Sequence, residues 1–218
     1  MSTKAELKQN VLASKLEELT PWLIAHRMHA LMALGIVVGV SLIASVFIIR
    51  KNESRDINWT RLAQAQILIG QKRADGAAQI LTEIKNANPG SVEALYASYY
   101  LGESALEEKK FDEAIQHFST VVSQGGNQPI RPLALTNLGF ANEQKGDYQA
   151  AAQTYQQFMS QYAEHFLAAR VQLSLGEALF RAGDKEGAKK SLGQLVDLYP
   201  TSPWAQNARK IMDKLETR

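Results

Sequence analysis

The chain has 218 residues, and its 24 basic and 22 acidic side chains give a formal net charge of +2. This balance offers no overall electrostatic case for binding nucleic acid. The absence of cysteine excludes disulfides, thiolate metal ligands, cysteine nucleophiles and an acylated lipoprotein cysteine. Ala, Leu and Gln are prominent, a composition that suits helices better than sheets.

Residues 1–28 are expected to form an N-terminal tail with short amphipathic helices. Leucines recur at helical spacing in the run NVLASKLEELTPWLIAHR. Thr20 followed by Pro21 is typical of a helix N-cap and first helical position. Trp22 and His26 then come close to the apolar segment that follows, and amphipathic rings are favoured at a membrane surface.

Residues 29–50 are predicted to form one transmembrane helix. The stretch ALMALGIVVGVSLIASVFII has no charged residue and is long enough to cross a hydrocarbon core of ~30 Å. A cleaved signal peptide has a shorter apolar region and a small-residue cleavage site, whereas this run ends in bulky residues before Arg50 and Lys51. A buried core helix is disfavoured because no other segment is as uniformly apolar. We therefore interpret the segment as an uncleaved signal-anchor.

Gly35 and Gly39 are four positions apart within this segment. Such a pair of small residues lets two membrane helices approach closely. We expect the pair to lie at a transmembrane packing surface, through which the chain would form a homo-oligomer or contact another membrane helix.

The orientation of the anchor is left open by its flanking charges. Four basic residues precede the apolar segment and four follow it closely: Lys4, Lys8, Lys15 and Arg27, then Arg50, Lys51, Arg55 and Arg61. If only the basic residues nearest the segment are counted, the positive-inside rule slightly disfavours an external C-terminal domain. Long domains, however, are translocated largely regardless of such charges.

In residues 51–218 a pattern recurs every 37 positions. A Leu-Gly pair occurs at 101–102, 138–139 and 175–176. Other recurring positions are Ala77, Ala114, Ala151 and Ala188, then Leu81, Phe118, Tyr155 and Leu192, then Ile84, Val121, Phe158 and Leu195. This order resembles the tetratricopeptide repeat (TPR), a helix–turn–helix unit usually of 34 residues. The resemblance implies that helical hairpins stack into a solenoid.

The predicted fold is therefore all-α, with an N-terminal tail, a single transmembrane helix and a TPR α-solenoid of about four 37-residue hairpins plus a C-terminal cap helix. Gly146-Asp147 and Gly183-Asp184 are expected at turns inside hairpins, with each Asp as an N-cap. We place the units near 57–93, 94–130, 131–167 and 168–202, and the cap helix at 203–216.

The sequence predicts no catalytic centre, no metal site and no cofactor. His117 and His165 fall in different repeats without partner residues. The serines do not form a nucleophile-elbow pattern, and the run GQKRADG lacks the Walker spacing. We therefore interpret the protein as a non-catalytic adaptor or scaffold.

A partner is expected on the inner face of the solenoid, which the first helix of each hairpin lines. Aromatic residues with isolated charges are typical of peptide-binding surfaces, although packing between repeats is the alternative for the aromatic members. A lysine and arginine clamp for a peptide C-terminus is missing. Counted from the Leu-Gly pairs, the predicted partner-binding residues are Trp59, Leu62, Tyr96, Tyr99, Glu103, Phe140, Glu143, Arg170, Glu177 and Phe180.

The whole arrangement resembles the YfgM-type family, an ancillary subunit of the bacterial Sec translocon. The run KAELKQN…WLIAHR looks like the charged, Trp-containing lead into that family's anchor. The resemblance implies a single-pass protein of the bacterial inner membrane, with a cytoplasmic tail and a periplasmic repeat domain. The partners that it implies are Sec translocon subunits, a periplasmic chaperone and exported client proteins.

Two other interpretations stay open, and a third is disfavoured. Scaffolds of outer-membrane assembly or cell division have C-terminal units similar to LGEALFRAGD…LYPTSPWA, but they are usually secreted or lipidated. The opposite orientation would instead make the protein a membrane scaffold that faces the cytoplasm. A membrane enzyme or transporter is disfavoured because one span cannot form a pathway alone.

Overall fold

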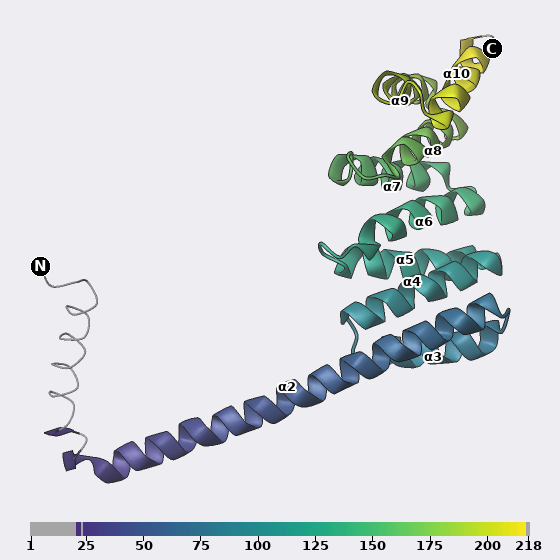
Figure 1. Cartoon of the computed structure of the whole chain (residues 1–218). Helices are drawn as coiled ribbons and strands as arrows, with labels where there is room; N and C mark the ends of the chain where they lie inside the picture. Colours follow the sequence, from purple (N-terminus) through teal and green to yellow (C-terminus); the bar gives the residue numbers. More distant parts are fainter. Residues whose placement is uncertain (1–20, 23, 217–218) are drawn as a thin grey trace, which may run out of the picture. The chain divides into compact units, whose positions relative to one another are not determined.

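The computed structural model describes residues 21, 22 and 24–216, and every regular element among them is an α-helix (Figure 1). The all-α prediction is confirmed. The short helices expected in the tail fall mostly outside the described residues. The chain forms two compact units, which divide between Asp56 and Ile57.

Helix α2 (Arg27–Gly70) contains 44 residues and passes through this division. In the described part of the chain, it is the one helix that is long and apolar enough to cross a membrane, with a mean hydropathy of 2.7 over its most apolar stretch. No side chain of that stretch is buried. Residues 51–56 (KNESRD) contain no Gly or Pro, so nothing in them breaks the helix.

The second unit, residues 57–218, is a stack of helical hairpins (Figure 1). The C-terminal part of α2 pairs with α3, α4 with α5, α6 with α7, and α8 with α9, while α10 packs on α8 and α9. The bounds of these helices are α3 (Ala74–Ala87), α4 (Val92–Glu107), α5 (Phe111–Gln124), α6 (Ile130–Lys145), α7 (Tyr148–Gln161), α8 (Ala168–Arg181), α9 (Lys185–Leu198) and α10 (Pro203–Glu216).

The core of the stack repeats the pattern of the sequence. The recurring alanines are fully buried, as are the large residues four and seven positions after each of them: Leu81 and Ile84, Phe118 and Val121, Tyr155 and Phe158, Leu192 and Leu195. The glycine of each Leu-Gly pair leaves room for the large residue of the second helix. A Cβ on Gly102 would lie only 2.8 Å from the ring of Phe118.

The turns inside the hairpins also repeat. Gly146 and Gly183 both have a φ of 89°, a left-handed conformation that suits glycine. Lys72 and Lys109 hold the equivalent places in the first two hairpins, each with a φ of 60°. Asp147 caps α7, because its Oδ1 accepts a hydrogen bond at 3.0 Å from a backbone N–H three residues later.

Candidate partner-binding groove

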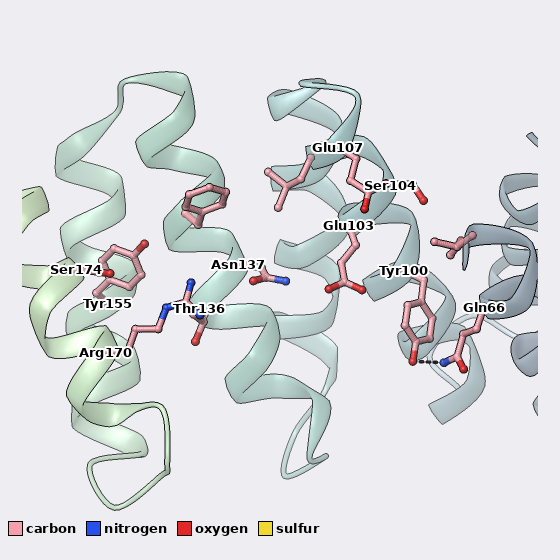
Figure 2. A pocket seen from close by; sticks show the side chains of 13 residues that line it. Gln66, Tyr100, Glu103, Ser104, Glu107, Thr136, Asn137, Tyr155, Arg170 and Ser174 are labelled. Atoms are coloured by element: carbon pink, nitrogen blue, oxygen red, sulfur yellow. Dashed lines mark hydrogen bonds between the residues drawn. The ribbon is translucent and has the colours of Figure 1, made fainter. Parts of the chain in front are cut away.

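A groove with a volume of about 400 Å³ runs along the second unit (Figure 2). Its walls come from the first helices of the hairpins: α2, α4, α6 and α8, with one residue from α7. The lining combines apolar and aromatic side chains (Ile69, Tyr100, Leu106, Phe140, Tyr155), uncharged polar ones (Gln66, Ser104, Thr136, Asn137, Ser174) and three charged ones (Glu103, Glu107, Arg170).

Three of the residues predicted from the sequence line this groove together: Glu103, Phe140 and Arg170. Two others are buried instead. Leu62 is 2% exposed and belongs to the core around Leu81, so it does not belong to the surface that a partner can reach. The ring of Tyr99 is 8% exposed and packs edge-on against Phe118, because this face of α4 points toward α5.

The remaining predicted residues lie outside the lining. Trp59 and Tyr96 pack edge-to-face on each other, with ring centroids 5.2 Å apart. They therefore link the first and second hairpins, as the packing alternative expected. Glu143, Glu177 and Phe180 are half-buried on α6 and α8.

A hydrogen-bond chain joins α4 to α6 beside the groove. The Tyr99 hydroxyl donates to Oε1 of Glu103 at 3.0 Å and accepts from Nδ2 of Asn137 at 3.0 Å. Burial raises the pKa of the Glu103 carboxyl, and the nearby charge of Glu107 adds to the rise. The hydroxyl of Tyr99 therefore helps to position a half-buried carboxylate at the groove wall.

A second contact joins α2 to α4 at the other end of the lining. Nε2 of Gln66 donates a hydrogen bond to the hydroxyl of Tyr100 (Figure 2). Burial also raises the pKa of Tyr100, to which the charge of Glu103 contributes. The tyrosine is therefore neutral at physiological pH and available as a hydrogen-bonding group.

Glu143 and Glu177 are a pair of half-buried carboxylates on neighbouring first helices. Burial raises the pKa of both, and the charge of Glu177 raises that of Glu143 further. Oε1 of Glu143 is buried without a hydrogen-bond partner. The neighbouring Arg181 acts in the opposite direction and lowers both pKa values.

One column of polar groove residues was not predicted from the sequence. Tyr100, Asn137 and Ser174 stand immediately before the three Leu-Gly pairs, and all three line the groove. Their 37-residue spacing was available as a signal. Because the residue type changes from repeat to repeat, a search for recurring identities does not find them.

The two glycines of the apolar segment lie on an open helix face. A Cβ on Gly35 or on Gly39 would meet nothing within 4 Å. Their role in packing against a second membrane helix stays a prediction. In the part of the chain that the structure describes, no three His, Asp or Glu side chains are grouped so that they could hold a metal ion.

Solved structures with the same fold support the repeat assignment. A tetratricopeptide repeat protein from Parabacteroides merdae has a TM-score of 0.63 at 15% identity, covering 73% of this chain and 60% of that one. TPR-like repeats assigned to a kinesin light chain from Podosopora anserina have a TM-score of 0.58 at 17% identity, and the match covers 75% of this chain and 94% of that one. MamA protein has a TM-score of 0.57 at 16% identity, and the match covers 73% of this chain and 86% of that one. At these identities, the likeness shows the fold alone.

No curated protein matches the chain significantly. Tetratricopeptide repeat families, in contrast, match residues 62–129, 99–164 and 170–202. These ranges together cover more than half of the chain, and they contain every residue that lines the groove. The chain therefore belongs to the tetratricopeptide repeat family, whose repeats are scaffolds for protein–protein interaction.

Proposed function

We propose that the protein is a membrane-anchored adaptor that holds segments of partner proteins in the groove of its solenoid. The observation that carries this proposal is the groove itself, which the first helices of all four hairpins line. The helix that precedes the repeats is apolar enough to span a bilayer. Tethering the groove to a membrane would raise its effective concentration toward membrane partners.

The lining suits an extended polypeptide segment. Phe140 is 41% exposed and offers an aromatic surface to an apolar side chain. Asn137, Ser104 and Ser174 offer donors and acceptors to the backbone of a bound segment, which must satisfy its own polar groups when it leaves water. Such a mixture recognises a protein segment better than a compact small molecule.

We further propose that the partners belong to the export machinery. The resemblance to the YfgM-type family supports this, since an apolar helix followed by TPR hairpins is that family's arrangement. The tail would then be cytoplasmic and the solenoid periplasmic. Sec translocon subunits, a periplasmic chaperone and exported clients would be the partners. A scaffold of another envelope assembly and a scaffold that faces the cytoplasm are the competing outcomes of the test.

The test places a photo-crosslinking amino acid at Phe140 in living cells. We expect crosslinks from this position to Sec subunits or to exported proteins. Phe166 is the matched control, because it is an aromatic residue outside the groove and is 81% exposed. Crosslinks of equal strength at both positions, or none at Phe140, would contradict a binding role for the groove.

The topology is tested in the same strain by adding protease to spheroplasts and detecting a C-terminal epitope. Digestion from outside is the expected result. Protection until the cells are lysed would exclude the export role, and it would leave a groove that acts in the cytoplasm.

A further inference from the structure

We propose that the groove selects extended segments that carry a lysine or arginine side chain, and that the carboxylates of Glu103 and Glu107 hold this side chain. The inference rests on the proposed adaptor function and names the chemistry of the partner. It commits to a cationic protein segment as the occupant of the groove.

The two carboxylates share one wall. Glu103 and Glu107 are one turn apart on α4, a spacing that puts two side chains on the same helix face, and both line the groove (Figure 2). Arg61, Lys110 and Lys145 form ion pairs with other carboxylates: Glu83, Glu108 and Asp112. Among the residues that the structure describes, Glu103 and Glu107 therefore face the groove without an ion-pair partner.

The lining contains one cation, Arg170 of α8, which lies away from this wall. Figure 2 places Asn137 of α6 between Arg170 and Glu103. The hydroxyl of Tyr99 donates to Glu103, but a neutral donor does not cancel the charge. Two neighbouring like charges, one of them half-buried, are costly unless a cation joins them.

The apolar residues beside these carboxylates fit the rest of a basic side chain. Leu106 and Phe140 line the same groove, and Phe140 holds the position of Glu103 in the next repeat. Lysine and arginine bury an aliphatic stem while their charged end stays at a polar site. An arginine would also stack on the exposed ring of Phe140. A side chain with both properties matches this wall, whereas an anionic segment would be repelled.

The experiment measures peptide binding to the full chain in lipid nanodiscs by fluorescence anisotropy. The probes are short labelled peptides that share the same leucine and serine positions and differ at one central residue: Lys, Arg, Gln or Glu. We expect the Lys and Arg peptides to bind about tenfold more tightly than the Gln peptide, because a partly desolvated ion pair forms. The Glu peptide should bind most weakly, and added salt should reduce the preference.

Two variants test whether the preference for Lys and Arg peptides comes from Glu103 and Glu107. Glu107→Lys changes an exposed side chain and should turn the preference toward the Glu peptide. Glu103→Gln keeps an acceptor for Tyr99 and should weaken the preference for Lys. Glu186→Gln is the matched control, since Glu186 is exposed in the first turn of α9, outside the groove lining, and it should leave the preference unchanged.

The outcomes separate this inference from the adaptor function. Equal binding of all four peptides would overturn the charge selectivity but leave the adaptor function in place. A Lys preference that survives Glu107→Lys would place the cation elsewhere and also overturn the inference. Binding of none of the peptides would contradict both proposals.

Discussion

Three glutamates on the first helices of successive hairpins are held half-buried: Glu103, Glu143 and Glu177. Burial is the main reason that the pKa of each carboxyl is raised, because a partly buried carboxylate loses hydration, which disfavours its charged form. In Glu143 one carboxyl oxygen, Oε1, is buried without a hydrogen-bond partner. Ionised glutamates at these positions work against the folded state.

The pH dependence of stability should show this effect at Glu143. Its pKa is raised above the usual value of 4.5, so the folded chain binds the proton more tightly than the unfolded chain does. The free energy of unfolding should therefore fall as the pH rises from about 4.5 through the raised pKa. Because the side chain is only half-buried, we expect Glu143→Gln to stabilise the protein at neutral pH by at most about 1 kcal/mol.

The measurement is urea unfolding of the full chain in detergent, followed by circular dichroism at neutral pH and near pH 4.5. The gain from Glu143→Gln should shrink at the acidic pH, where the native glutamate is protonated. Glu186→Gln, at an exposed position, should have little effect at either pH. A gain of the same size at both pH values would contradict the electrostatic cause.

Single residues of the groove were only partly predictable from the sequence. The 37-residue period placed Glu103, Phe140 and Arg170 on helix faces that do line the groove. The same count included Leu62 and Tyr99, which are buried. A repeat pattern identifies the face of a helix to within about one position in a turn of 3.6 residues. It does not distinguish the inner surface from the adjoining contact with the next helix.

In the second, third and fourth hairpins, the two helices approach closely where a glycine faces a large side chain. Gly102 faces Phe118, Gly139 faces Tyr155 and Gly176 faces Leu192. All three glycines are in the interior of helices, where alanine would be intrinsically better by about 1 kcal/mol. Glycine at these positions is therefore explained by helix packing, and this explanation can be tested.

We expect Gly102→Ala to lower the free energy of unfolding by about 1–3 kcal/mol, because the new methyl group overlaps the buried Phe118 ring. Gly193→Ala is the matched control. Gly193 is also helical, but a Cβ there meets nothing within 4 Å, so this substitution should stabilise the protein by about 0.5–1 kcal/mol. Urea unfolding measures both, and two changes of the same sign would contradict the packing explanation.

The sequence predicted that the chain is all-helical, and it predicted the glycine turns at Gly146 and Gly183. It did not predict that α2 is continuous. The prediction separated a membrane helix ending at residue 50 from a repeat domain starting at 51, because the composition changes there from apolar to charged. The structure has one helix from Arg27 to Gly70. Composition governs which solvent surrounds a helix, whereas Gly, Pro and capping residues govern where it stops, and residues 51–56 contain neither Gly nor Pro.

At the scale of the whole solenoid, stability is a sum of contacts between neighbours. Each helix from α3 to α9 packs on the next one along the chain, so an end must be covered by an element with a polar outer side. Helix α10 has this role at the C-terminus. Its Ala208 is fully buried in a cluster with Leu173, Leu192 and Leu195.

Placing a charge inside this cluster should detach α10. We expect Ala208→Asp to lower the free energy of unfolding of the C-terminal part by about 3 kcal/mol or more, because a carboxylate would be buried among leucines. Lys210→Asp makes a charge change on an exposed position of the same helix and should stay within about 0.5 kcal/mol. Urea unfolding and the binding of a hydrophobic dye measure the two effects.

The location of the damage follows from the nearest-neighbour nature of the stack. Detaching α10 exposes the α8–α9 hairpin, while the carboxylate wall of the groove is on α4, two hairpins away. Ala208→Asp should therefore split the unfolding transition into two steps and leave crosslinking from Phe140 on α6 largely intact. If the whole solenoid unfolded in one step instead, the hairpins would be coupled more strongly than neighbour contacts alone provide. The stack would then unfold as one cooperative unit, and the groove would be lost with its cap.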